Sequence, residues 1–416
     1  MTKRILVLGA GTGGTIIANR LRRRLDDVEI VVVDRDNRHV YQPGLLFVPF
    51  GLTHAEDIVR DRGRQLRDGI EYRNAEVEAV DLETDTVRIV DGEAMSYDVL
   101  VVATGATLLP EETEGLTGPG WMEQAFTFYD LVGSSALEGA LARFDGGRVI
   151  VNMVDLPIKC PVAPLEFSFL ADWYFRERGI RDRVDLAYVT PLDGAFTKPV
   201  AAAALGGLLE EKGIELITEF NTGEVDPAGG RLVSYDDREE RFDLLVSIPL
   251  HGGAPLVGRS PGLGDDLNFI ATDDHTLQSD AKPNVFVIGD AANLPISKAG
   301  SVTHFEGEVL TENVARFLAG ETLDASYDGH ANCFIETGFH KALMIDFNYE
   351  TEPLTGRFPN ALGAPLLKES RLNHLGKLMF EWFYWHALLP GRDVPGIGPD
   401  MPTAGKDIPQ TTRGAS

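Results

Sequence analysis

Two cysteines, Cys160 and Cys333, are the only thiols in the chain, and they lie far apart in the sequence. Two thiols are too few for a disulfide-stapled scaffold, and their separation does not match the spacing of a zinc knuckle. Cys160 stands where a turn leads into a predicted helix. A helix N-terminus favours the thiolate, so we expect a lowered pKa for this thiol. The two residues are candidates for redox chemistry, with ordinary buried thiols as the alternative.

Three glycines near the N-terminus, Gly9, Gly11 and Gly14, have the GxGxxG spacing that is typical of dinucleotide sites. They follow the apolar strand pattern of residues 5–8 and open a predicted helix, whose free N–H groups and dipole favour a pyrophosphate. Asp34 ends the next predicted strand, where a carboxylate can accept both ribose hydroxyls. The group predicts a dinucleotide site; the alternative is a glycine-rich turn without a ligand.

The corresponding turn of a second strand–helix unit has no glycine triplet. After the strand pattern of residues 149–151, the turn holds the bulky Leu156, Pro157 and Ile158 and leads to Cys160. A pyrophosphate needs close approach to the backbone, which these side chains obstruct. The turn therefore argues against a nicotinamide dinucleotide as electron donor.

Alternating strands and helices must position these groups. Short β-branched runs separated by helical stretches recur from residue 5 to about residue 318. This alternation predicts the α/β class, with two Rossmann-like, doubly wound parallel sheets. A chain of 416 residues is long enough for two or three packed domains.

Composition excludes several classes of protein. With 44% apolar residues the chain can bury large cores, which rules out a disordered or collagen-like chain. A formal charge of -26 at pH 7 argues against nucleic acid or anionic headgroups as partners held by bulk charge. We expect no secretory signal and no membrane-spanning helix, because no apolar stretch reaches the required length of about 18 residues. Any membrane contact should therefore be peripheral.

Aromatic residues crowd residues 370–389 and predict an amphipathic helix. One stripe at spacings of three and four contains Leu372, Leu375, Met379, Trp382, His386 and Leu389. Further apolar surface comes from Phe380, Phe383, Tyr384 and Trp385. This surplus favours a helix that lies in a membrane interface or contacts a quinone; ordinary burial and a dimer interface are the alternatives.

Three segments in order resemble the two-dinucleotide-fold flavoproteins. They are the glycine turn, the strand ending in Ala103-Thr104-Gly105, and the segment with Gly289-Asp290. This resemblance implies FAD rather than NAD at the first site, with the carboxylate of Asp290 toward the ribityl chain. The residues expected to bind FAD are Gly9, Gly11, Gly14, Asp34, Pro43, Ala103, Thr104, Gly105, Gly289, Asp290, Lys298 and Gly300.

The cysteine segments narrow the resemblance further. Lys159-Cys160-Pro161 with Glu166, and the strand Cys333-Phe334-Ile335-Glu336, resemble the sulfide:quinone oxidoreductases and the related flavocytochrome c sulfide dehydrogenases. The resemblance implies that Cys160 and Cys333 form a redox pair that oxidises sulfide to zero-valent sulfur or polysulfide. It also implies that electrons pass through FAD to a membrane quinone. Glu166 is then a candidate for proton transfer.

The resemblance also predicts a quinone site and a location. His374-Leu375-Gly376-Lys377 and the aromatics after it are similar to the C-terminus of the quinone-reducing members, where Lys377 would lie near the flavin. A quinone pocket is expected from Phe347, Lys377, Phe380 and Phe383. The partners implied are hydrogen sulfide and a membrane quinone, with peripheral attachment to the cell membrane at the cytoplasmic face. A homo-oligomer is possible, and the sequence leaves the oligomeric state open.

The expected domains follow from the same comparison. Residues 1–105 and 278–322 would form the FAD-binding Rossmann-like domain, and residues 106–277 a second one that carries Cys160. Residues 323–392 would cover the flavin and contact the membrane or quinone, followed by a flexible tail at 393–416. Many relatives have a third cysteine that this chain lacks. Two alternatives stay open: an NAD(P)H:quinone oxidoreductase, and a non-catalytic FAD-bound module that carries sulfur.

Overall fold

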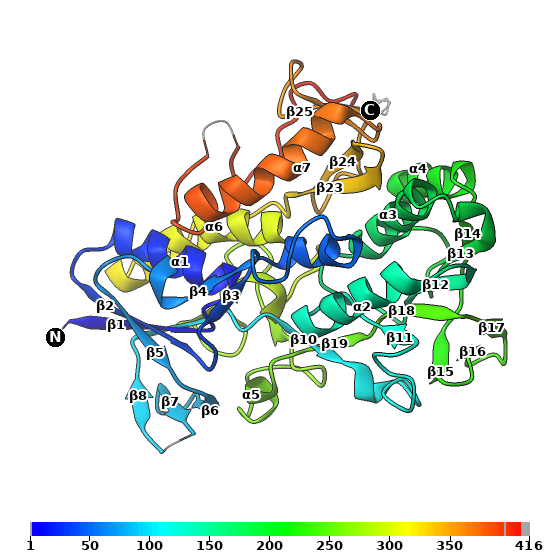
Figure 1. The fold of residues 1–416 in the computed structure, drawn as a ribbon. Helices are drawn as coiled ribbons and strands as arrows, with labels where there is room; N and C mark the ends of the chain where they lie inside the picture. The colour runs from blue at the N-terminus through cyan, green and yellow to red at the C-terminus, as the bar shows by residue number, and fades with distance from the viewer. Residues whose placement is uncertain (1, 91, 395–396, 409–416) are drawn as a thin grey trace, which may run out of the picture.

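Two parallel five-stranded sheets form the frame of the computed structural model, which describes residues 2–90, 92–394 and 397–408 (Figure 1). The first sheet has the order β21-β9-β1-β2-β5. Its strands are β1 (Lys3–Leu8), β2 (Val28–Asp34), β5 (Ile70–Asn74), β9 (Val99–Val102) and β21 (Val285–Val287). The segment that forms the second sheet is inserted in the chain between β9 and β21 of the first sheet.

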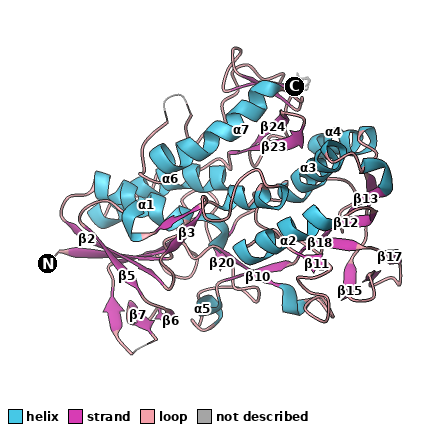
Figure 2. Cartoon of the chain, viewed as in Figure 1, coloured by secondary structure: helices cyan, strands magenta, loops and turns pink. Residues whose placement is uncertain are grey.

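The two faces of the first sheet are buried by different layers. Ile5 and Val7 of β1 pack into the core beneath α1 (Thr12–Arg24) and α6 (Gly300–Ala319), while Leu6 and Leu8 pack into a separate core on the other side. That second core is covered by the antiparallel sheet of β6 (Val77–Asp81), β7 (Thr86–Ile89) and β8 (Ala94–Ser96). Figure 2 shows these layers on opposite sides of the sheet. Burial on both faces explains the nearly continuous apolar runs.

The second sheet repeats the plan with the order β11-β18-β12-β13-β14. Its strands are β11 (Ala125–Phe126), β12 (Gly147–Met153), β13 (Val184–Val189), β14 (Glu215–Ile217) and β18 (Leu244–Ile248). Its helices are α2 (Leu131–Arg143), α3 (Ala163–Glu177) and α4 (Pro199–Glu211). A smaller antiparallel sheet joins β15 (Thr222–Asp226), β16 (Arg231–Ser234) and β17 (Glu239–Arg241).

Short elements complete the frame between and beside the sheets. Paired strands are β3 (Arg38–Val40) with β4 (Val59–Asp61), β10 (Ala106–Leu109) with β19 (Leu250–Gly253), and β20 (Ile270–Ala271) with β22 (Ala292–Asn293). A short helix, α5 (Pro255–Gly258), packs against β6. The predicted fold class, α/β with two Rossmann-like parallel sheets, is confirmed.

A hairpin and a long helix follow the second pass through the first sheet. The hairpin consists of β23 (Ala331–Gly338) and β24 (Lys341–Phe347), and α7 (Arg371–Phe383) packs against both strands. Figure 1 shows α7 in orange above β23 and β24. A second pair of strands, β25 (Gly356–Phe358) and β26 (Ala364–Leu366), packs beside α7 and β24.

The predicted stripe on residues 370–389 is interrupted by a π-helical turn, η7 (Tyr384–Leu388). The wider turn rotates the residues that follow Phe383. Tyr384 and Trp385 are only 2% and 4% exposed, and with Leu389 they pack around Tyr41. The prediction that this whole segment spreads apolar surface outward is therefore wrong beyond Phe383. Leu372, Leu375, Leu378, Met379 and Trp382 of α7 do stay exposed.

Residues 397–408, which we expected in a flexible tail, instead pack against the body of the protein. Met401 is buried, and the ammonium of Lys406 pairs with Asp346 on β24. The other oxygen of Asp346 lies 2.8 Å from Nε2 of His330, and all three side chains are fully buried. A buried carboxylate between two nitrogen partners fixes the segment to the hairpin. The rest of the predicted tail, 395–396 and 409–416, lies outside the described residues.

Candidate functional site

The turn from β1 to α1 packs so closely that two of its glycines have no room for a side chain. A Cβ on Gly14 would lie 1.8 Å from the carbonyl oxygen of Gly9, and one on Gly9 would lie 2.4 Å from that of Ala103. Gly11 differs, because a Cβ there would meet nothing within 4 Å. The first turn of α1 has no side-chain cap. Its free N–H groups therefore face open space at Gly11, as an anion site requires.

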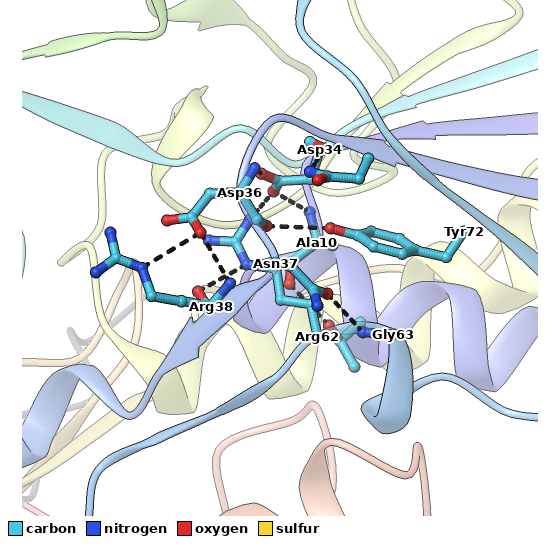
Figure 3. Close-up of polar contacts among 10 residues, drawn as sticks. Ala10, Asp34, Asp36, Asn37, Arg38, Arg62, Gly63 and Tyr72 are labelled. Carbon is cyan, nitrogen blue, oxygen red and sulfur yellow. Dashed lines mark hydrogen bonds and ion pairs between the residues drawn. The ribbon is translucent and has the colours of Figure 1, made fainter. Parts of the chain in front are cut away.

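Asp34 at the end of β2 already has several partners (Figure 3). Its carboxylate accepts hydrogen bonds from the backbone N–H of Ala10 at 2.7 Å and of Asp36 at 3.0 Å. It also forms an ion pair with Arg62, which follows β4. The role of Arg62 was missed, because no local pattern connects a residue after β4 with the end of β2. Its guanidinium is therefore also placed to contact a sugar or phosphate bound next to Asp34.

The remaining residues predicted to bind FAD fit a dinucleotide. The hydroxyl of Thr104 is buried with no hydrogen-bond partner in the described chain, and a Cβ on Gly105 or on Gly300 would meet nothing within 4 Å. Gly300 begins α6, whose N-terminus also has no side-chain cap. An orphaned hydroxyl and two open glycines between β9 and α6 are the features expected where a cofactor completes the packing.

Asp290 and Lys298 lie beside this opening. Burial raises the pKa of the Asp290 carboxyl, against the attraction of Lys298 and Lys159. The ammonium of Lys298 donates hydrogen bonds to the carbonyl oxygens of Asp290 at 2.9 Å and Ala292 at 2.8 Å. Lys298 therefore shapes the Asp290 turn through its backbone. Pro43 lies in η1 (Gln42–Leu46).

Cys160 lies on a long connection between β12 and α3, residues 154–162. Its φ of +46° is in the left-handed region, an uncommon conformation for a residue with a side chain. The Cys160 N–H donates to the carbonyl oxygen of Lys298 at 2.6 Å, and the Cys160 carbonyl accepts from the hydroxyl of Tyr129 at 3.2 Å. The second unit thereby brings its cysteine against the segment that precedes α6 of the first unit. Such strained residues are frequent at functional sites.

Cys333 lies on β23, opposite Ile345 of β24. Both cysteines are free, half-buried thiols. Burial raises the pKa of Cys333, and the nearness of Cys160 is its second cause. The charge of Lys377 lowers the pKa of both thiols, and the charge of Glu166 raises both. The structure therefore brings Cys160, Cys333, Glu166 and Lys377 into one cluster from three distant parts of the sequence.

The predicted lowering of the Cys160 pKa is wrong. Burial raises the pKa of this thiol to about 12, and Glu166 raises it further, against the opposing effects of Lys377 and the Ala163 N–H. The helix begins only at Ala163, so its N-terminal dipole acts on Cys160 less than the loss of water does. In this state the thiol holds its proton at neutral pH.

Glu166 and Lys377 form a buried ion pair beside the cysteines. The ammonium of Lys377 lies 2.8 Å from Oε1 of Glu166, which also accepts the backbone N–H of Glu336 at 2.8 Å. Burial raises the pKa of Glu166, and Lys377 opposes this. For Lys377, burial lowers the pKa but Glu166 and Cys160 outweigh it, so the pKa is raised. One carboxylate that holds two donors can take up a proton next to the thiols.

Of the predicted quinone residues, only Phe347 lines the open cavity of about 260 Å³ beside the Cys160 connection. The other residues that line this cavity are Leu156, Pro157, Ile158, Pro161, Thr197, Lys198, Leu294, Pro295, Ile296, Ser297 and Lys298. Phe380 instead packs toward the cluster around Tyr41, and Lys377 reaches toward Phe47, 6.0 Å from the centre of its ring. Phe347 ends β24 and lies on the side of the Cys160 connection. Among the described residues, those of α7 do not line this cavity.

Four further residues of the site were not predicted. Tyr129 fixes the Cys160 carbonyl, and its ring lies edge-on to the buried His251, 5.5 Å away. Nδ1 of His374 lies 2.7 Å from Oε1 of Glu336, next to the Glu166–Lys377 pair. His374 and Lys377 are three residues apart, a spacing that places both on one face of a helix. This spacing is the feature of the sequence that could have predicted His374 next to Lys377.

Fold and site together define an oxidoreductase of the two-dinucleotide type. The family described as pyridine nucleotide-disulphide oxidoreductase matches residues 3–135. The chain is 28% identical over 402 residues to the mitochondrial sulfide:quinone oxidoreductase of Mus musculus, which covers 93% of this chain and 86% of that protein. It is 24% identical over 310 residues to the sulfide-quinone reductase of Aquifex aeolicus, which covers 71% and 70%.

The fold agrees with these relatives. The X-ray structure of the Aquifex aeolicus sulfide:quinone oxidoreductase superposes with a TM-score of 0.80, at 19% identity, over 94% of this chain and 92% of that one. The chain is therefore similar over most of its length to sulfide:quinone oxidoreductases, as its cysteine segments indicated. Among the described residues, the helices are too short or too polar to cross a membrane.

Proposed function

We propose that this protein oxidises sulfide through the pair Cys160 and Cys333 and passes the electrons through FAD to a quinone. The observation that carries this proposal is the meeting of the two cysteines of the chain with a buried proton acceptor, Glu166, and a cation, Lys377. The match to the relatives named above covers most of their length. Both relatives are sulfide:quinone oxidoreductases by name, which supports the same reaction in this protein.

The cofactor would be held by the open turn at Gly11, by Thr104 and Gly105, and by Asp290 and the start of α6 at Gly300. A flavin held by these residues would supply the two-electron acceptor between the thiol pair and a quinone. The corresponding connection of the second unit, residues 154–162, contains no glycine and carries Cys160 instead. This replacement supports electron entry through sulfur.

The sulfur steps balance with the groups at hand. Oxidation of the free thiols releases two protons and two electrons and forms an S–S bond between Cys160 and Cys333. Hydrosulfide then attacks the sulfur of Cys160, forming a new S–S bond, breaking the bridge and releasing Cys333 as a thiolate. A second hydrosulfide takes the outer sulfur and leaves as the hydrogen disulfide anion, HSS−, which restores the Cys160 thiol, while the Cys333 thiolate takes back one of the two protons. In sum, two hydrosulfides yield one hydrogen disulfide anion, one proton and two electrons.

Glu166 and Lys377 have complementary tasks in these steps. The Glu166 carboxylate takes up one of the two protons released when the bridge forms, since it is the acceptor whose charge acts on both thiols. Lys377 stabilises the thiolate of Cys333 when the bridge opens, because its charge lowers the pKa of that thiol. The resting pKa of about 12 for Cys160 means that a thiolate forms only with this help.

Two faces of the site can then serve two substrates. The 260 Å³ cavity adjoins the Cys160 connection and carries Lys198 and Lys298, so we assign it to the entry of hydrosulfide. This assignment replaces Phe347 as a quinone contact. The quinone would approach from the side of Lys377, Phe380 and Phe383, where the exposed apolar face of α7 would rest on the membrane surface.

Anaerobic mixing of the flavin-loaded protein with sulfide or with NADH tests the proposal. We expect sulfide to bleach the visible flavin absorbance and a quinone to restore it, whereas NADH has little effect. Cys160→Ser should keep the flavin but lose the bleaching by sulfide. Reduction by NADH and not by sulfide would establish the nicotinamide alternative. Equal bleaching of the wild type and Cys160→Ser would exclude the cysteine pair as the point of entry.

A further inference from the structure

A buried acid next to the cysteine cluster has no task in the steps above. Glu336 follows Cys333 by three residues on β23, and its side chain is 1% exposed. Oε1 lies 2.7 Å from Nδ1 of His374, while Oε2 is buried without a hydrogen-bond partner in the described chain. Burial raises the pKa of Glu336 to about 8, so the group is mostly a neutral acid at neutral pH. A neutral buried acid can give a proton and, once ionised, take one up again.

The inner side of Glu336 faces the ion pair beside the thiols. Its backbone N–H donates to Oε1 of Glu166, the same oxygen that holds Lys377. The charge of Lys377 lowers the pKa of Glu336, and that of Glu336 raises the pKa of Lys377. The carboxyl of Glu336 therefore lies close to the group that receives protons from the cysteines.

The outer side of Glu336 leads to the surface. The His374 side chain is 17% exposed, and its ring centre lies 5.5 Å from that of His340, which stands exposed at the turn between β23 and β24. Burial and the neighbouring His340 lower the pKa of His374, so its ring is neutral and can accept a proton.

Other charged groups at this turn are engaged with one another. Glu369 lies 3.3 Å from Lys341 and 3.8 Å from Lys212. Glu166 and Lys377 are the charged groups that act on Glu336 from α3 and α7. His374 is thus the titratable partner that connects Glu336 with water.

We propose that Glu336 and His374 relay protons between the Glu166–Lys377 pair and the solvent at the β23–β24 turn. In the outward direction Glu336 gives its proton to Nδ1 of His374, and Nε2 of His374 releases one to water. Glu336 then regains a proton from Lys377, which takes up the one that Glu166 received from the thiols. In each cycle one proton enters the relay from Glu166 and one leaves it to water. The same steps in reverse carry protons inward, where they can serve the reduction of a quinone. This inference rests on the proposed function.

Glu336→Gln tests the relay, because the amide keeps the size and the neutral state of the side chain but cannot pass a proton. We expect sulfide-dependent quinone reduction at saturating substrate to fall about tenfold or more, with an unchanged KM for sulfide. In a plot of this rate against pH, the change that is due to the titration of Glu336 should disappear. His374→Ala should show a similar loss that added imidazole restores. Glu369→Gln, at the same turn but outside the relay, should behave as the wild type.

The outcomes separate the relay from the reaction itself. If sulfide fails to bleach the flavin of the wild type, the proposed function fails, and the relay with it. If the wild type reacts but both variants keep its rate and pH profile, the relay alone is wrong. A third outcome is a lower rate in either variant, with a pH profile parallel to that of the wild type and no rescue of His374→Ala by imidazole. This outcome would mean that the residues have a structural role, and it would also overturn the relay.

Discussion

The two parallel sheets of this protein use the same strand–helix step for different chemistry. In the first sheet, β1 passes into α1 through three residues, Gly9 to Gly11, and in the second, β12 passes into α3 through the nine residues 154–162. The short connection exposes backbone N–H groups at an open glycine. The long one turns a thiol toward the first unit, with Cys160 in a left-handed conformation. The same strand–helix step thus leaves an open turn in one sheet and places a cysteine against the first unit in the other.

The two connections also differ in what holds them. The glycine turn is fixed by its own atoms and by Ala103, all in the first quarter of the chain. The Cys160 connection depends on Lys298, on Tyr129 and, through Glu166, on Lys377 of α7. The glycine turn is therefore a local motif, whereas the position of Cys160 depends on contacts with distant parts of the chain. Changes far from Cys160 should therefore disturb the second site and spare the first.

The largest effect should come from the glycine turn itself. Gly14→Ala places a Cβ 1.8 Å from the Gly9 carbonyl, so the turn must open and flavin binding should be abolished, with much of the protein insoluble. Gly11→Ala has free space in the protein and should fold with an unchanged melting temperature of the apoprotein, but retain less flavin. Flavin content and thermal unfolding measure both. Equal behaviour of the two variants would contradict the assignment of Gly11 to the ligand side.

The second connection should respond to the loss of its distant cation. Lys377→Met leaves Glu166 buried and unpaired, and we expect kcat for sulfide to fall about 100-fold. Because Lys377 holds the pKa of Glu166 down, that pKa should rise in the variant, and the remaining activity should shift to higher pH. Flavin content should not change. Lys377→Arg keeps the charge and should recover part of the rate; an unshifted pH profile in Lys377→Met would refute the pairing.

The buried pair of Lys406 and Asp346 tests whether the C-terminal segment supports the cysteine hairpin. Lys406→Met leaves a buried carboxylate with His330 alone and should cost about 3–5 kcal/mol in the free energy of unfolding. Glu93→Gln removes an exposed ion pair with Arg73 and should cost less than about 1 kcal/mol. Urea unfolding compares the two. Similar losses would mean that residues 397–408 contribute little to the hairpin.

Glu336 predicts a smaller effect that depends on pH. Its pKa in the folded protein is about 8, above its ordinary 4.5, because burial disfavours the charge. Between these values the unfolded chain has lost the proton and the folded one has kept it, so stability falls as pH rises through this window. Glu336→Gln should remove that slope and melt at a higher temperature than the wild type at pH 8, with a smaller difference near pH 4.5. Parallel melting curves across the window would contradict a buried, neutral Glu336.

The smallest effect should come from the outer face of α7. Trp382 and Leu378 are 59% and 53% exposed, and changing both to serine should weaken binding to phosphatidylcholine vesicles roughly tenfold. Leu362→Ser is the matched control, since Leu362 is 93% exposed but lies outside α7. The net charge of -26 predicts weaker binding to anionic vesicles. Equal sedimentation of all variants with vesicles would rule out α7 as the contact.

Local patterns predicted the fold and the parts of the site that are local. The alternation of apolar runs gave both parallel sheets, and the glycine spacing predicted the tight turn at Gly9 and Gly14. Three features could not be predicted from the sequence, because they depend on tertiary structure. The pKa of Cys160 depends on burial by the whole cluster, the π-helical turn after Phe383 breaks the expected period, and Lys406 finds a buried partner despite its loop-like surroundings. Composition predicts a loop there, but it cannot predict which loop residue becomes buried.

The most direct test of sulfur as the point of electron entry is to find the sulfur on the protein. The oxidised, flavin-loaded protein would be mixed anaerobically with one equivalent of sulfide, quenched with an alkylating reagent and digested for mass spectrometry. We expect one added sulfur on the peptide with Cys160, an alkylated thiol at Cys333 and neither change when sulfide is left out. Flavin that is reduced while both cysteine peptides stay free of added sulfur would contradict the account.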